Sequence, residues 1–223
     1  MEQPFGTLYI LAAAKINGLK LELPPFEYGE ATGTPGRYTQ RTPEFRAKFP
    51  RGKAPGFESA SGDFRLVESG AIAHYVSEAG PKAAQLLGAS LEERAKVQEW
   101  IFWHELELGT PLPELISWQL GTAAYDAQKQ GAAAKALDDH LSYLEGSLKG
   151  RKWLVNDQAG PSLADLTIGA SLLFACRFYI DKKMRDRLPQ MVAFLTRLRE
   201  VEGLEELFTI QMVEERRQPP SAS

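Results

Sequence analysis

The hydrophobic pattern divides the chain into a first part with short apolar runs and a second part with long helical periods. In the first part, residues 7–11 (TLYIL) have the composition of a strand, and residues 19–26 (LKLELPPF) alternate between apolar and polar positions, as a half-buried strand does. Residues 27–53 are rich in Gly, Pro and Thr, which favours a long surface loop with a short helical piece. Residues 54–59 and 64–69 are predicted to be two short strands around a turn.

Two helices are predicted in the same part of the chain. Residues 11–15 (LAAAK) are helix-like and follow the first strand without a turn. Residues 69–80 (SGAIAHYVSEAG) have helical apolar spacing, and Gly80-Pro81 should end the helix. The predicted order is therefore strand, helix, strand, loop, strand, strand and helix, which is the order of a small α/β unit.

From about residue 90 onward, the apolar positions recur every three or four residues. Ser90 and Glu93 have the spacing of a capping box before the first long helix. Residues 162–180 are apolar nearly all round, which indicates a buried central helix, and Pro189 occupies a first-turn position of the next helix. We predict an α/β domain over residues 1–79, an all-helical domain over residues 90–211 and a disordered tail over residues 212–223.

Composition narrows the class of protein. The chain has 223 residues, of which 43% are hydrophobic and 25% charged, as in soluble globular proteins. The net charge of −3 argues against nucleic acid or an acidic membrane surface as a partner. A single cysteine, Cys176, permits no disulfide within the chain and suits a reducing compartment. Because neither a signal peptide nor an apolar run of about 18 to 20 residues is present, we expect a cytoplasmic protein that does not enter a membrane.

The histidines and the cysteine do not indicate a particular function. The three histidines lack the spacing of metal ligands, so no metal site is expected. Cys176 lies in an apolar run, which favours a small buried residue over a reactive thiol.

Two short stretches suggest binding chemistry. Pro55 stands at the start of a predicted strand, where it cannot donate a ladder hydrogen bond. A cis bond after Ala54 would turn the main-chain N–H and C=O of Ala54 outward, but a trans turn is the alternative, since only about 5 to 6% of such bonds are cis. Glu68 and Ser69 end a strand and begin a helix, where free N–H groups favour a carboxylate, or Ser69 is only the N-cap.

Four segments in this order resemble one family. They are FEYGE (residues 26–30), TPEFRAKFPRGKAPGFE (42–58), ESGAIAHYV (68–76) and VQEWIFWHELEL (97–108). Together they resemble the cytosolic glutathione transferase superfamily and, within it, the transferase-like part of the gamma subunit of translation elongation factor 1 and fungal transferases of that type. The resemblance implies a thioredoxin-like N-terminal domain, an all-helical C-terminal domain, a homodimer and glutathione as co-substrate.

The resemblance also implies roles for single residues. Ala54 would hydrogen-bond the cysteinyl main chain of glutathione, with Pro55 in the cis form. Glu68 and Ser69 would hold the γ-glutamyl end. Lys53 would lie near the glycyl carboxylate.

Arg51 or Lys48 would assist Lys53 at the glycyl end of glutathione.

Ser162 and Asp165 match the buried capping box of the family, a folding element in which each residue accepts the other's main-chain N–H.

The opening of the chain departs from the family pattern. Members of the family carry a Ser, Tyr or Cys that stabilises the glutathione thiolate in a loop between the first strand and the first helix. Here Tyr9 is followed almost at once by residues 11–15, which match the end of that helix, so about a dozen residues of the family pattern are missing, judged by a helix of three turns. Thr7 and Tyr9 are the remaining, weak catalytic candidates.

Three functions follow from this comparison. The first is an enzyme that conjugates the glutathione thiolate to an apolar electrophile, with activity weakened by the shortened loop. The second is a non-catalytic interaction module of the elongation factor 1 gamma type, with translation elongation factor subunits as partners. The third is a folded dimer whose ligand site is impaired.

Overall fold

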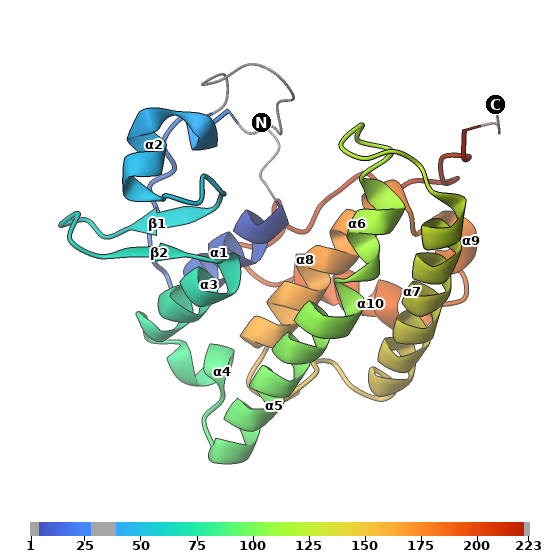
Figure 1. Ribbon diagram of the computed structural model, residues 1–223. Helices are drawn as coiled ribbons and strands as arrows, with labels where there is room; N and C mark the ends of the chain where they lie inside the picture. The colour runs from blue at the N-terminus through green and yellow to red at the C-terminus, as the bar shows by residue number, and fades with distance from the viewer. Residues whose placement is uncertain (1–4, 28–38, 221–223) are drawn as a thin grey trace. The chain divides into compact units, whose positions relative to one another are not determined.

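The computed structural model describes residues 5–27 and 39–220, which fall into two compact units, Met1–Ala83 and Ala84–Ser223 (Figure 1). The first unit contains α1 (Phe5–Ile16), η1 (Thr39–Arg41), α2 (Pro43–Lys48), β1 (Gly56–Glu58), β2 (Arg65–Val67) and α3 (Ser69–Glu78). The second contains α5 (Leu91–Trp103), η2 (His104–Leu108), α6 (Pro111–Ile116), α7 (Ala127–Ser147), α8 (Leu163–Phe178), α9 (Lys182–Arg185) and α10 (Pro189–Arg199), while the short α4 (Ala83–Leu87) starts at the boundary.

The strand predicted over residues 7–11 is wrong, because these residues belong to α1. No Gly or Pro separates them from Ala12–Ala14, and alanine is the strongest helix former, so the helix extends back to Phe5. Tyr9 and Ile10 are 2% and 4% exposed, so the apolar run that suggested a buried strand forms a buried helix.

The second predicted strand, residues 19–26, is also wrong. The structure assigns no strand there, and Leu23 is 53% exposed. A strand exists only when another strand shares its hydrogen bonds, and the sheet of the described residues contains β1 and β2 alone. Most of the predicted loop, residues 28–38, lies outside the described residues, and its helical piece is α2.

The hairpin of β1 and β2 is confirmed. The two strands pair antiparallel with Phe57 opposite Leu66, and they form the sheet of the described residues. Helix α3 follows directly and buries Ile72 and Val76.

Asn17, just after α1, fixes the end of α1 to the end of α3. Its Nδ2 donates to the carbonyls of Val76 and Ser77 at 2.8 and 2.9 Å, and its Oδ1 accepts the N–H of Lys82 at 2.8 Å. The Asn17 side chain therefore satisfies carbonyls at the last turn of α3, which a helix leaves without internal partners.

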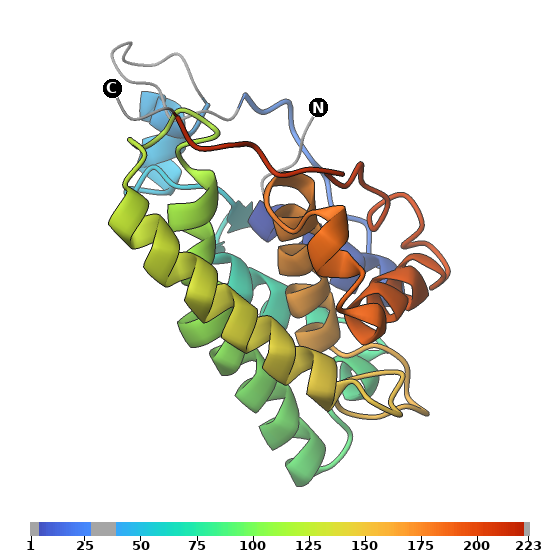
Figure 2. The same cartoon turned by 90° about the vertical axis from the view of Figure 1, so that its right-hand side faces the viewer.

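The second unit is built around α8, as its apolar sequence predicts. Thirteen of the 16 residues of α8 are buried, and α5, α6 and α10 contact it. The longest of the described helices, α7, runs along the side of the unit (Figure 2). Its leucines Leu137, Leu141 and Leu144 are buried. No helix among residues 5–27 and 39–220 is long and apolar enough to cross a bilayer.

The predicted capping box at the start of α8 is confirmed. The Asp165 carboxylate accepts the N–H and the hydroxyl of Ser162 at 2.8 and 2.6 Å, and also the N–H of Leu154 at 2.8 Å. Burial raises the pKa of Asp165 to about 6, although these hydrogen bonds oppose the rise. Because the folded chain holds this proton more tightly than the unfolded chain, the contribution of Asp165 to stability falls as the pH rises through about 6.

Two other predictions need correction. Ser90 caps α5, but Glu93 accepts the N–H of Ala89, one residue earlier than in a capping box. The tail was predicted to be disordered from residue 212, yet Val213 donates to the Cys176 carbonyl at 2.9 Å and Arg216 donates to Asp181 at 2.9 Å. These partners are distant in sequence, so composition could not reveal them.

We predict that Asp165→Ala lowers the free energy of unfolding by about 2 to 4 kcal/mol at pH 7, because the buried N–H groups of Ser162 and Leu154 lose their acceptor. Urea denaturation measures this change. The control is Ser90→Ala, which removes an exposed cap and should lower the free energy of unfolding by about 1 kcal/mol. An equally small loss in both variants would contradict a special role for the buried box.

Candidate functional site

The peptide bond between Ala54 and Pro55 is cis, as the resemblance implies, so the alternative of a trans turn is wrong. The bond lies between α2 and β1, just before the hairpin. No hydrogen bond joins the main chain of Ala54 to another residue that the structure describes. Its N–H and C=O can therefore pair with an extended peptide, as the edge of a sheet does.

Ser69 begins α3 but does not cap it. The N-cap is Glu68, whose carbonyl accepts the N–H of Ile72 at 3.0 Å, and Ser69 is the first helical residue. The alternative that Ser69 serves only as a cap is therefore wrong. Within the described ranges, the Ser69 hydroxyl and the N–H groups of Ser69, Gly70 and Ala71 make no hydrogen bond, so they can hold an anion.

Glu68 has an unusual main-chain conformation. Its φ of 66° and ψ of 118° make it the one residue other than glycine with positive φ among those described. Such a conformation is costly for a residue with a Cβ atom and is often found at functional sites. Here it joins the end of the hairpin to the start of α3.

The start of α1 lies against both groups. A Cβ atom on Gly6 would lie 2.9 Å from Ser69 Cβ and 3.5 Å from Pro55 Cδ. Ser69 and Pro55 thus lie around one point, although 14 positions separate them in the sequence. We did not identify Gly6 from the sequence, where a glycine before an apolar run carries no distinctive signal.

Arg51 and Glu68 form an ion pair with each other in the described structure. Their side chains are 60% and 65% exposed, so water screens the attraction and the pair adds little to stability. Both charges can therefore exchange partners with a ligand at small cost. Lys53 is exposed two residues further on.

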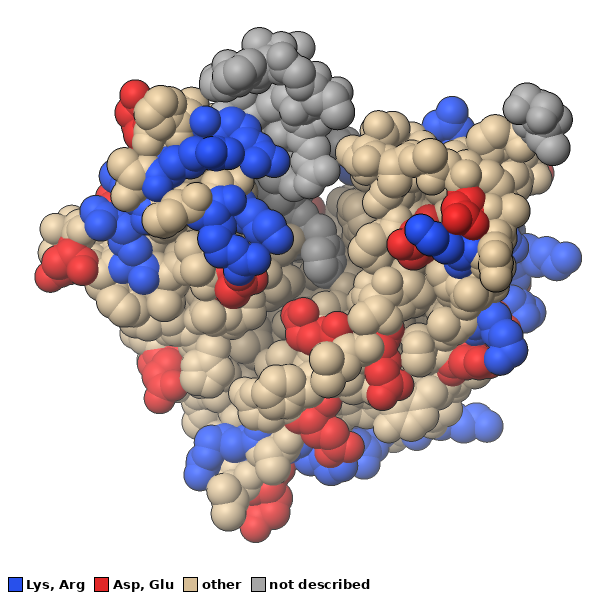
Figure 3. Space-filling view, viewed as in Figure 1, with Lys and Arg blue, Asp and Glu red and all other residues tan. Residues whose placement is uncertain are grey.

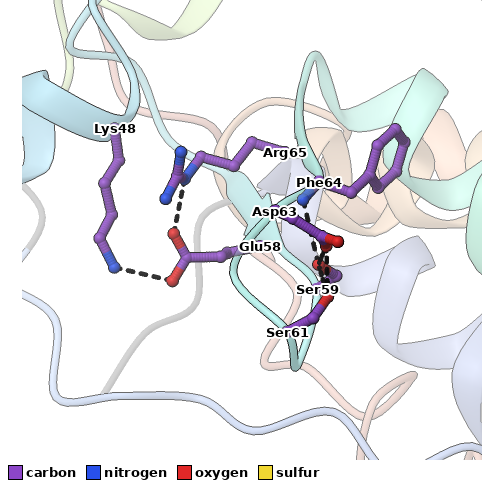
Figure 4. A network of polar contacts seen from close by, with 7 residues as sticks. All are labelled: Lys48, Glu58, Ser59, Ser61, Asp63, Phe64 and Arg65. Atoms are coloured by element: carbon purple, nitrogen blue, oxygen red, sulfur yellow. Dashed lines mark hydrogen bonds and ion pairs between the residues drawn. The ribbon is translucent and has the colours of Figure 1, made fainter.

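Lys48 is held in a second network. Its ammonium group lies 2.7 Å from Glu58, which also pairs with Arg65 at 2.6 Å across the hairpin (Figure 4). The hydrogen bonds from Lys48 and then Arg65 lower the pKa of Glu58. Of the two residues expected to assist Lys53, Arg51 is thus the one beside Glu68.

Lys and Arg side chains gather on the first unit (Figure 3). The exposed basic residues between positions 41 and 65 are Arg41, Arg46, Lys48, Arg51, Lys53 and Arg65. A ligand with carboxylates would be attracted to this surface.

The two weak catalytic candidates do not lie among the exposed residues of the candidate site. Thr7 and Tyr9 are 9% and 2% exposed within α1. Cys176 is buried in α8, and burial raises the pKa of its thiol to about 12, so it is not a reactive thiol. Within the part of the chain that the structure describes, no group of three His, Cys, Asp or Glu side chains could hold a metal ion.

We predict that Glu68→Gly raises the free energy of unfolding by about 1 kcal/mol, because glycine adopts positive φ without strain. The matched control is Glu78→Gly at the other end of α3, where glycine should lower the free energy of unfolding by about 0.5 to 1 kcal/mol. Urea denaturation without ligand compares the two. A loss of stability in Glu68→Gly as large as in the control would contradict the strain.

The known proteins that this chain is similar to all point to the same family. The family description "Glutathione S-transferase, N-terminal domain" matches residues 19–78, and "Glutathione S-transferase, C-terminal domain" matches residues 80–202. The chain is 41% identical to glutathione S-transferase-like protein LUC7 of Fusarium sp. over 215 residues, which cover 92% of this chain and 93% of that one. It is 31% identical to elongation factor 1-gamma of Equus caballus over 198 residues, which cover 82% of this chain but 42% of that protein.

The fold is shared with a solved structure. The GST-like domain of elongation factor 1-gamma from Saccharomyces cerevisiae superimposes with a TM-score of 0.80 at 22% identity, covering 99% of this chain and 96% of that one. The expected transferase fold is therefore confirmed, even though two of its predicted strands are not strands here. The chain belongs to the glutathione S-transferase family.

Proposed function

We propose that the chain binds glutathione on the first unit and transfers it slowly to electrophiles. This proposal rests on the main chain of Ala54 and the first turn of α3, whose N–H groups have no partner among residues 5–27 and 39–220. Glutathione is a tripeptide with one ammonium group and two carboxylates. It needs hydrogen bonds to its peptide groups and opposite charges at both ends, and these residues offer both.

Each part of the tripeptide has a partner in this proposal. Ala54 pairs with the cysteinyl main chain. The γ-glutamyl carboxylate accepts the Ser69 hydroxyl and an N–H of α3, and the ammonium group replaces Arg51 beside Glu68. Lys53 and the released Arg51 then face the glycyl carboxylate.

The reaction is attack of the thiolate on an electrophilic carbon. A carbon–sulfur bond forms, the leaving group departs with its electron pair, and the thiol proton passes to water. A thiol with a pKa near 8.5 is about 3% ionised at pH 7, so the rate depends on lowering that pKa. Because Thr7 and Tyr9 are buried, we expect main-chain donors to supply the effect, and we expect slow turnover.

The alternative function is a non-catalytic interaction module, with translation elongation factor subunits as partners. The 31% identity to elongation factor 1-gamma supports it. Retention on immobilised glutathione with measurable turnover of an aromatic halide would support the enzyme. Co-purification with elongation factor subunits without glutathione binding would support the module. Both functions place the protein in the cytoplasm.

We also propose a homodimer, because each unit exposes an apolar surface. In the second unit, Phe102, Leu106 and Tyr143 are 58%, 71% and 52% exposed around a hollow of about 330 Å³, with Glu99 and Glu107 at its edge. Apolar side chains that lie together at the surface often mark an interface.

The first unit offers a complementary surface. Phe64 and Tyr75 are 41% and 40% exposed, and their ring centroids lie 5.2 Å apart. An apolar ridge fits an apolar hollow. A second copy of the chain supplies one of each, so a two-fold dimer can form the contact twice.

We predict that glutathione at about 100 times its dissociation constant adds about 2.7 kcal/mol to the free energy of unfolding. Glu68→Gln and Ser69→Ala should each weaken binding by about tenfold, because each removes a charge-assisted hydrogen bond. Thermal denaturation with and without glutathione measures the stabilisation. Its absence in the unsubstituted chain would refute the proposed binding.

We predict that Leu106→Lys converts the dimer to a monomer, because it places a charge in the apolar surface. Leu91→Lys is the matched control, since both leucines are 71% exposed but Leu91 lies outside the surface. Sedimentation velocity distinguishes the two states. A monomeric unsubstituted chain, or a dimer that survives Leu106→Lys, would argue against this interface.

A further inference from the structure

We infer that Gly6 is a positioning residue of the glutathione site. Its missing side chain allows the first turn of α1 to lie against Ser69 and Pro55, and this contact sets the start of α3 in the place where the γ-glutamyl end binds. The inference rests on the glutathione site proposed above and adds a residue to it.

The contact leaves no room for a methyl group. A Cβ atom on Gly6 would lie 2.9 Å from Ser69 Cβ, 3.0 Å from Ser69 Oγ and 3.5 Å from Pro55 Cδ. Non-bonded carbon atoms pack best at about 3.5 to 4.0 Å, so the contact with Pro55 is tolerable and the contact with Ser69 Cβ is not.

Side-chain rotation cannot relieve this collision. Rotation about χ1 moves Ser69 Oγ but leaves Cβ in place, so the main chain of α1 or α3 must move. At the other end of both helices, Asn17 holds the carbonyls of Val76 and Ser77 at 2.8 and 2.9 Å. The displacement therefore falls on the first turns, which carry the groups proposed to bind the ligand.

A displaced first turn would bind poorly, because hydrogen bonds weaken steeply with distance and angle. The neighbouring glycine provides a contrast. A Cβ atom on Gly70 would meet nothing within 4 Å, so space does not require a glycine there. Between the two glycines beside Ser69, only Gly6 is required by the packing.

The experiment is a double-mutant cycle of Gly6→Ala and Ser69→Gly, with dissociation constants for glutathione from calorimetric titration. Gly6→Ala alone should weaken binding about tenfold or more. Ser69→Gly removes both atoms that collide, so the double variant should bind as Ser69→Gly alone does. Gly131→Ala is the control: it makes the same exchange in α7, where a Cβ atom meets nothing within 4 Å, and it should not change binding.

The other possible results test the role of Gly6 and the proposed function separately. Unchanged binding in Gly6→Ala overturns the role of Gly6, and so does an equal loss in the Ser69→Gly background, because Gly6 would then not act through Ser69. If Gly6→Ala does not fold, the double variant decides: folding with the affinity of Ser69→Gly supports the inference, and failure to fold overturns it. If the unsubstituted chain binds no glutathione, the proposed function itself fails.

Discussion

The close packing of α1 on α3 is the constraint on which the first unit depends. Gly6 meets Ser69 at one end, and Asn17 binds the carbonyls of Val76 and Ser77 at the other. The two helices therefore run parallel, with both N-terminal ends beside Pro55. Partial positive charge from both helices is then directed to the same place, where main-chain N–H groups of α3 have no partner within the described ranges.

Most signals that act over a few residues predict the structure correctly, although the box of Ser90 and Glu93 is incomplete. The capping box of Ser162 and Asp165, the hairpin and the first-turn proline of α10 each depend on neighbours in the sequence. The strand over residues 7–11 failed because a strand depends on a distant partner. The same apolar residues can be buried in a helix, and the alanines after them favour that solution.

The candidate site also combines residues that the sequence identifies with contacts that it does not reveal. The sequence identified Pro55, Glu68 and Ser69, and it left open whether the proline is cis and whether the serine is a cap. It could not show that Arg51 pairs with Glu68 or that Gly6 meets Ser69, because both contacts join segments whose approach depends on the whole unit. Positive φ at Glu68 was equally hidden, since glutamate carries no preference for it.

Binding and activation make different demands on this site. The free energy of binding is the sum of several contacts, so the exposed charges of Arg51 and Glu68 can each contribute little although water screens them. Activation needs one strong effect at one sulfur atom: lowering a thiol pKa from about 8.5 to about 6.5 requires about 2.7 kcal/mol in favour of the thiolate. One hydrogen bond to a charged atom supplies about 1.5 to 3 kcal/mol, so a single well-placed main-chain N–H reaches that value only at the upper end of its range. The proposed site can therefore bind glutathione and still turn it over slowly, because binding and thiol activation depend on different contacts.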